Sequence, residues 1–226
     1  MASRSILVRV VALAFAAGLA FVVYDATRAL AALDLAERDR DTWQRPGDII
    51  RTLELKPGNR VVDFGSGAGY FSLRLAPVVG AGGRVVAVDL RRLALTFLTI
   101  RAWQRGDRQI ETVVGDERRA VLPRGPFDAV LIINTYHELD HRQDILRQLY
   151  EPLVPGGRLV VADRRPRNQG AAHPAGDVHD RHTMHPDLAE AEIRAAGFTV
   201  VSRDDTFIDQ AGDEPWWLMV ARKPHP

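Results

Sequence analysis

The stretch RVVDFGSGAGY, residues 60–70, decides the fold of this chain. Residues 61–64 are apolar apart from Asp63, which is typical of a buried strand. Glycine then occupies positions 65, 67 and 69, where it allows a sharp turn and a close approach of the backbone to a ligand. A strand that ends beside an acid and a glycine-rich turn predicts a ligand site at the carboxyl end of that strand.

Outward from this stretch, short apolar runs alternate with helical patterns as far as the end of the chain. The alternation predicts an α/β fold, a doubly wound sheet of seven mostly parallel strands. The last two runs have no helix between them, so we expect them to pair as a hairpin in which the last strand is antiparallel.

The expected strands cover residues 60–64, 84–89, 109–114, 127–134, 158–163, 198–207 and 216–223. The expected helices cover residues 70–76, 90–105, 142–153 and 186–196. In the second of these helices, helical spacing places four apolar residues on one face: Leu93, Phe97, Ile100 and Trp103.

Further acids follow the next two expected strands. Asp89 ends the second strand, and Asp116 and Glu117 follow the third. The carboxylate of Asp89 can accept hydrogen bonds from both hydroxyls of a ribose, or it can cap the helix that follows. An acid at position 116 or 117 can accept a hydrogen bond from an adenine amino group, or it can be a simple turn residue. The pattern indicates a ligand that contains a nucleoside.

The glycine turn restricts the kind of nucleoside. A dinucleotide fingerprint is Gly-x-Gly-x-x-Gly, whereas this chain has Gly-x-Gly-x-Gly with Tyr70 in the place of the last glycine. Asp63 would also repel a pyrophosphate, so the pattern favours a ligand without phosphate and with a positive charge. S-adenosylmethionine fits this description. A nicotinamide-dependent oxidoreductase of Rossmann type is the alternative enzyme, and a non-catalytic, membrane-tethered binder of an S-adenosyl ligand is the alternative outside enzymes.

From about Pro46 onward the chain resembles the class I S-adenosylmethionine-dependent methyltransferases, through VVDFGSGAGYFSLRLA, VVAVDL, GD, FDAVLIINTYHEL, LVPGGRLVVAD and AAGF in order. The resemblance is strongest to small bacterial methyltransferases with an N-terminal export- or anchor-type segment. It implies a Rossmann-like fold and methyl transfer to a small-molecule acceptor. It also implies which residues surround S-adenosylmethionine and its product S-adenosylhomocysteine: Asp63, Gly65, Ser66, Gly67, Gly69, Asp89, Leu90, Asp116, Glu117 and Asn134.

The resemblance places the segment from Asn134 to His137 beside the methyl group and the acceptor. The segment is not the Asn-Pro-Pro-Tyr of amino methyltransferases, which speaks against an amide or an exocyclic amine as acceptor. For a hydroxyl acceptor, the imidazole of His137 can take the proton, so Tyr136 and His137 are the catalytic candidates. The alternative is that both residues only close the strand.

Composition excludes several kinds of chemistry. The chain has 226 residues with no cysteine, which excludes disulfides, cysteine-ligated zinc and thiol nucleophiles. Its net charge of +1 argues against a nucleic acid as partner. Scattered histidines invite a metal hypothesis: His137, His141, His173, His179, His182 and His185. His137 and His141 have the i, i+4 spacing of a helical metal site, but the next helix is expected to begin only at about Asp140, so we expect no metal.

The N-terminus has an organisation of its own. Residues 10–24 form an uncharged, mostly apolar run after Arg4 and Arg9. We expect residues 1–31 to be a signal peptide or a membrane anchor, residues 32–45 a linker or N-terminal helix, and residues 46–226 the methyltransferase domain. Membrane association would run through residues 6–24. The basic flank indicates that the domain after it is exported to the periplasm or anchored to the membrane. A location on the cytoplasmic face is the alternative, because the cofactor is made in the cytosol. The oligomeric state is not predicted.

Overall fold

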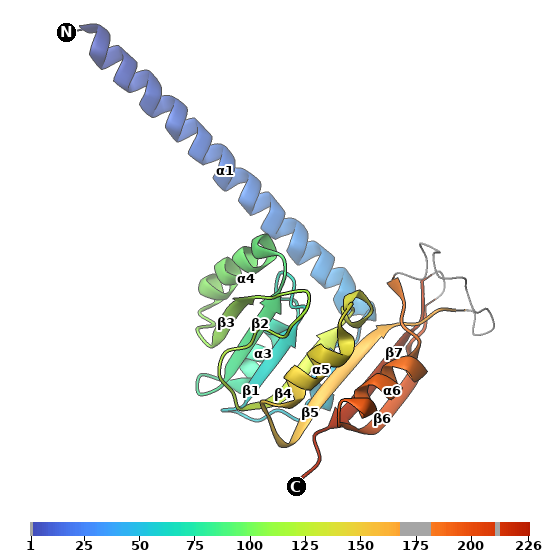
Figure 1. Cartoon of the computed structure of the whole chain (residues 1–226). Helices are drawn as coiled ribbons and strands as arrows, with labels where there is room; N and C mark the ends of the chain where they lie inside the picture. Colours follow the sequence, from blue (N-terminus) through green and yellow to red (C-terminus); the bar gives the residue numbers. More distant parts are fainter. Residues whose placement is uncertain (1, 168–181, 211–212) are drawn as a thin grey trace. The chain divides into compact units, whose positions relative to one another are not determined.

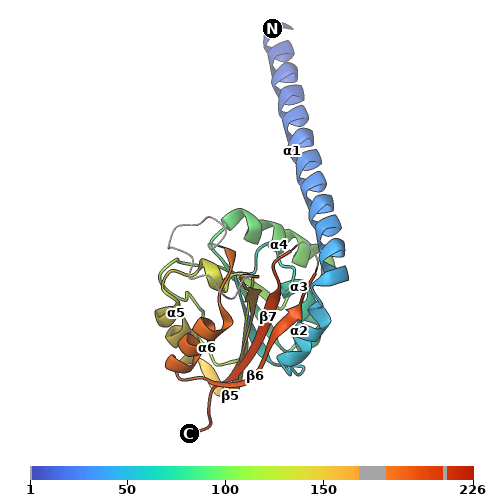
Figure 2. The same ribbon diagram turned by 90° about the vertical axis from the view of Figure 1, so that its right-hand side faces the viewer.

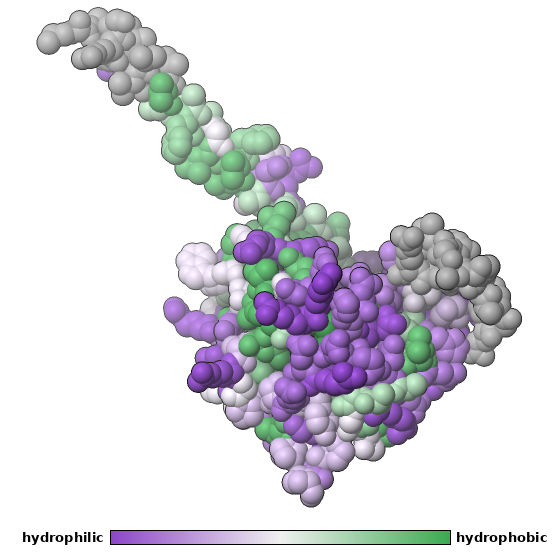
Figure 3. Space-filling view, in the orientation of Figure 1, coloured by the Kyte–Doolittle hydropathy of each residue, from purple (hydrophilic) through white to green (hydrophobic). Residues whose placement is uncertain are grey.

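The computed structural model describes residues 2–167, 182–210 and 213–226. The chain forms two compact units, Met1–Trp43 and Gln44–Pro226. The first unit is one helix, α1 (Ala2–Trp43), which includes residues 32–43 of the segment that the sequence assigned to a linker or helix. From Val11 onward this helix is long and apolar enough to cross a membrane. Its apolar surface is visible in Figure 3.

The second unit is built on a seven-stranded sheet in the order β3-β2-β1-β4-β5-β7-β6 (Figure 1). Strand β7 is antiparallel to both of its neighbours and the other pairings are parallel, which confirms the predicted fold. The strands are β1 (Arg60–Phe64), β2 (Arg84–Asp89), β3 (Ile110–Val114), β4 (Phe127–Ile133), β5 (Leu153–Arg164), β6 (Thr199–Ile208) and β7 (Trp216–Arg222).

Helices cover both faces of the sheet, with α5 and α6 on one side and α2 and α3 on the other (Figure 2). The main core joins Val62, Val86 and Ile132 of the sheet to Ile145 of α5 and Ile193 of α6. A smaller cluster joins α3 and α4 to β2 on the other face. The helices are α2 (Pro46–Thr52), α3 (Ser72–Val79), α4 (Arg92–Arg105), α5 (Arg142–Tyr150), α6 (Pro186–Ala195) and the short 3₁₀ helix η1 (Tyr136–Glu138).

Two details differ from the sequence prediction. Strand β5 begins at Leu153 rather than at 158, because Pro155-Gly156-Gly157 forms an irregularity inside the strand instead of a loop before it. In α4, the helix buries Leu95, Leu98 and Ala102, so the apolar face predicted by helical spacing points the other way. Leu93 is 69% exposed and Trp103 is 80% exposed.

Candidate functional site

The glycine turn folds over the carboxyl end of β2. The backbone N–H groups of Gly65 and Ser66 both donate to the carbonyl of Val88, at 2.8 and 2.9 Å. Gly65, Gly67 and Gly69 all have positive φ angles, +85°, +55° and +93°. Glycine adopts this region without strain, so the residue type explains why the turn forms here.

Gly65 also lies against the segment that follows β4. A Cβ at this position would lie 2.2 Å from Oγ1 of Thr135. Gly58 has a similar φ of +93° but open space around it, which makes it a matched control. We expect Gly65→Ala to lower the free energy of unfolding by about 1–3 kcal/mol more than Gly58→Ala, because only the first adds a steric clash to the backbone strain. Urea unfolding of both variants measures the difference, and equal losses would show that Thr135 moves freely.

Two buried carboxylates flank the turn. Asp63 lies opposite Ala87 in the parallel pairing of β1 and β2, so Asp63 and Asp89 point to the same face of the sheet. Asp63 is 2% exposed and accepts a hydrogen bond from Oγ of Ser72, at 2.5 Å. Asp89 is 6% exposed and accepts from the N–H groups of Gly67, at 2.7 Å, and Arg91, at 2.8 Å. A phosphate here would be repelled by two buried carboxylates, whereas a sulfonium or amino group would be attracted by them. The exposed Arg91 side chain pairs with Asp89 at 3.2 Å at the edge of this site.

The end of β3 lies beside the end of β2. The N–H of Gly115 donates to the carbonyl of Asp89 at 2.9 Å, and a Cβ at Gly115 would lie 3.5 Å from the side chain of Leu90. The Asp116 side chain is 40% exposed and lies 3.7 Å from Arg119. Glu117 is exposed. Of these two acids, Asp116 is the less exposed.

Two buried polar atoms in the same region have no hydrogen-bond partner among the described residues. They are Oγ of Ser66, in the glycine turn, and Oδ1 of Asn134, directly after β4. Asn134 has a φ of +53°, and its N–H donates to the carbonyl of Ala162 at 2.8 Å. Buried polar atoms in native proteins are almost always paired, so both atoms fit a site that a polar ligand completes.

His137 forms a buried dyad with Asp163. Its side chain is 3% exposed, and Nδ1 lies 2.8 Å from Oδ1 of Asp163, which is fully buried at the end of β5. The N–H of His137 also donates to Oδ2 of the same carboxylate, at 2.9 Å. When Nδ1 donates its proton to Asp163, Nε2 keeps the lone pair and can accept a proton. The His182 ring packs edge-on against His137 at 6.0 Å.

Asp163 is a functional candidate that the sequence analysis did not identify. The available signal was an acid at the carboxyl end of the fifth strand, in the block LVVAD, analogous to the acids that end β1 and β2. Strand β5 is paired with β4 so that Ala162 lies opposite Ile133, which brings Asp163 next to the segment that carries His137.

Tyr136 lies in the core rather than at the edge of an open site. Its side chain is fully buried, and its hydroxyl donates to Glu192 at 2.6 Å. Glu192 also accepts from Nε of Arg142, at 2.8 Å. Burial raises the pKa of the Tyr136 hydroxyl far above its usual range, and the bond to Glu192 raises it further, so the hydroxyl stays protonated at neutral pH. This placement favours the alternative in which Tyr136 closes the strand, and its catalytic role stays a prediction.

The remaining histidines do not add a metal site to the described part of the chain. Residues 2–167, 182–210 and 213–226 contain no cluster of three or more potential ligands. His137 lies in η1, whereas His141 precedes α5, so the two do not share a helix. His173 and His179 lie outside the described residues.

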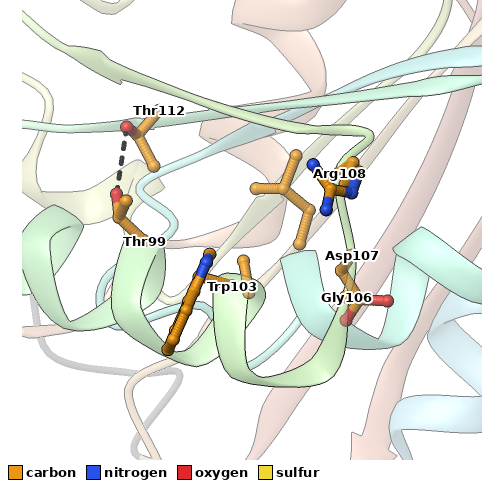
Figure 4. A pocket seen from close by; sticks show the side chains of 8 residues that line it. Thr99, Trp103, Gly106, Asp107, Arg108 and Thr112 are labelled. Atoms are coloured by element: carbon orange, nitrogen blue, oxygen red, sulfur yellow. Dashed lines mark hydrogen bonds between the residues drawn. The ribbon is translucent and has the colours of Figure 1, made fainter.

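A pocket of about 320 Å³ lies between α4 and β3 (Figure 4). Thr99 and Trp103 of α4 and Thr112 of β3 line it, together with Asp107 and Arg108 of the loop between them. None of the residues that the sequence assigned to the cofactor lines this pocket. We therefore place the candidate site at the strand ends and not here.

Comparisons with known proteins relate the chain to methyltransferases. Residues 61–157 match the family model of a methyltransferase domain. The chain is 34% identical over 122 residues to the ubiquinone/menaquinone biosynthesis C-methyltransferase UbiE of Ectopseudomonas mendocina, a match that covers 54% of this chain and 47% of that protein. The chain thus spans about half the length of the curated relatives it matches.

Solved structures share the fold at lower identity. An S-adenosylmethionine-dependent methyltransferase from Aquifex aeolicus has a TM-score of 0.66 and 21% identity, and the match covers 79% of this chain and 89% of that one. The cyclase SpnF has a TM-score of 0.70 and 19% identity, with 81% and 82% covered. Because a cyclase also has this fold, the likeness establishes the architecture and leaves the reaction to the residues of the site.

Proposed function

Because the chain belongs to the class I S-adenosylmethionine-dependent methyltransferase family, we propose that it transfers a methyl group from S-adenosylmethionine to a small-molecule acceptor. The observation that carries this proposal is the pair of buried carboxylates, Asp63 and Asp89, beside the glycine turn. They suit the sulfonium, amino and hydroxyl groups of this cofactor, and they disfavour the pyrophosphate of a nicotinamide dinucleotide.

Each side of the site has a separate task in this proposal. Asp63 and the backbone of Gly65 and Gly67 hold the methionine end, with Ser66 and Gly69 completing the turn. Asp89 accepts the ribose hydroxyls, with Leu90 and Asp116 beside the adenine. Glu117 is the alternative acid for the adenine amino group. Asn134 supplies an amide oxygen near the sulfonium, where its buried Oδ1 has no partner among the described residues.

The bound cofactor supplies an activated methyl group, and the residues of the chain align the acceptor and remove its proton. We assign the proton to Nε2 of His137, while Asp163 holds the imidazole in the tautomer that leaves Nε2 without a proton. Nε2 lies 3.7 Å from Oε1 of Glu138, a carboxylate that can stabilise the protonated ring. Because the His137 side chain is 3% exposed, water competes little for this nitrogen. The name of the curated relatives suggests a carbon acceptor, and an acidic carbon, like a hydroxyl, has a proton for His137 to take.

Binding experiments separate this proposal from its alternatives. S-adenosylhomocysteine should raise the melting temperature of the protein, and NAD should not, because only the first lacks phosphate. A shift with NAD alone would favour the oxidoreductase. A shift with S-adenosylhomocysteine but no transfer of labelled methyl groups into extracts of the source cells would favour the non-catalytic binder.

We further propose that α1 tethers the protein to a membrane through residues 6–24. Support comes from the apolar run and from the 0% burial of the candidate span in α1. A chain that starts at Leu33 lacks this run, and we expect it to be soluble, to fold, and to bind S-adenosylhomocysteine as tightly as the full chain. Fractionation and calorimetry test this prediction. The proposal fails if the full chain is freely soluble at its intact mass, or if the shortened chain does not fold.

A further inference from the structure

The outward face of α4 exposes large apolar side chains. This α4 face consists of Leu93, Phe97, Ile100 and Trp103. Leu93 is 69% exposed and Trp103 80% exposed, and the Trp103 ring stands at the edge of the pocket in Figure 4. Phe97 and Ile100 lie between them and are half-buried. Aligned apolar side chains on the surface of a helix mark a site of interaction with a protein or a membrane.

Exposed arginines lie at both ends of this face, whereas Arg101 within α4 is buried. Between Leu90 and Arg108 the chain carries five arginines and one acid, Asp107. Arg91 pairs with Asp89, and Arg105 pairs with Asp107. Arg92 and Arg108 are exposed and form no ion pair with any residue that the structure describes. The α4 face is therefore apolar at its centre and positively charged at both ends of the helix.

We infer that the α4 face rests on an anionic lipid bilayer, with Leu93 and Trp103 among the headgroups and Arg92 and Arg108 against lipid phosphates. Tryptophan and leucine on one face of a helix, flanked by arginine, are the residues that interfacial helices use. The positive ends complement the negative charge of the lipid. A second copy of this chain would instead bring the same arginines together, which like-charge repulsion disfavours.

This inference rests on the proposed membrane tether. Residues 25–43 continue α1 beyond the apolar run, and 19 helical residues span about 28 Å. Through this segment the tether keeps the second unit from diffusing away from the membrane. Binding of the α4 face to the bilayer is then intramolecular, so even a weak attraction keeps the face docked for much of the time.

The absence of cysteine allows a direct test on the full chain. Thr96 is exposed on the outward side of α4, so Thr96→Cys introduces a single labelling site and leaves all four apolar side chains in place. Val201 of β6 is 49% exposed and Val201→Cys is the matched control. Both variants carry an environment-sensitive fluorophore and are reconstituted into phosphatidylcholine vesicles with and without phosphatidylglycerol.

We expect the label at position 96 to become lipid-exposed, with a blue-shifted emission that lipid-borne quenchers reduce, only when phosphatidylglycerol is present. The label at position 201 should stay in water. Neutralising Arg92 and Arg108 by Gln should lower the ratio of docked to undocked protein by about fivefold for each arginine.

Three outcomes would overturn the inference. In the first, the protein floats with the vesicles but the label at position 96 stays in water like the label at position 201. This result would show that the α4 face does not dock on the membrane, while the tether does. Another is burial of the label without vesicles that grows with protein concentration, which indicates a second copy. The third is equal burial with and without anionic lipid. Binding of S-adenosylhomocysteine, measured on the same samples, shows separately whether the proposed function holds.

Discussion

His137→Gln is expected to lower the rate of methyl transfer by about 10²–10⁴-fold while cofactor affinity stays unchanged, because in the proposed mechanism the imidazole takes the acceptor's proton and does not hold the cofactor. The geometric basis is the 2.8 Å contact of Nδ1 with the buried carboxylate of Asp163. Transfer of labelled methyl groups into extracts of the source cells measures the rate, and calorimetry with S-adenosylhomocysteine measures the affinity.

Asp163→Asn tests whether Asp163 positions the imidazole of His137. An amide at this position can donate to Nδ1 and so favour the wrong tautomer, which should lower the maximal rate and leave the apparent affinity for S-adenosylmethionine unchanged. If both variants transfer methyl groups at the original rate, the dyad is a structural hydrogen bond between η1 and β5. If His137→Gln loses cofactor affinity instead, His137 lies on the cofactor side of the methyl group.

The second large effect is expected at Asp89. We predict that Asp89→Ala weakens binding of S-adenosylhomocysteine by about 100-fold, because charge-assisted hydrogen bonds to two ribose hydroxyls are lost, each worth about 1.5–3 kcal/mol. Isothermal calorimetry measures the affinity, and thermal unfolding shows whether the variant is still folded.

Asp116→Ala is the control for this prediction. Its carboxylate is 40% exposed and already lies beside Arg119, so solvent weakens any bond that it makes, and we expect a loss of affinity below tenfold. An Asp89→Ala variant that binds S-adenosylhomocysteine normally would remove Asp89 from the site. A larger loss at Asp116 than at Asp89 would mean that the adenosine lies closer to β3 than we propose.

Local sequence determined the elements of the fold and the acids and glycines at the carboxyl ends of β1 and β2. Strands β1 and β2 occupy the predicted residues, because each is a short apolar run bounded by a turn. Asp63 and Asp89 could be predicted as neighbours, since parallel strands bring their carboxyl ends to one edge of the sheet. The glycine turn could be predicted as well, because glycine at three alternate positions is typical of a backbone with positive φ angles, and the turn has them.

The tertiary structure alone decided which side chains meet across the sheet and which faces are covered. Asp163 and His137 are 26 residues apart in sequence, and the register of β4 and β5 brings them to 2.8 Å. Tyr136 follows a strand, but its hydroxyl finds its partner in Glu192 of α6, 56 residues away, which no local pattern reveals. In α4 the sequence marks an apolar face, whereas the packing against β2 and α3 buries another. Periodicity reports how residues are grouped along an element, and only the neighbouring elements determine which group is removed from water.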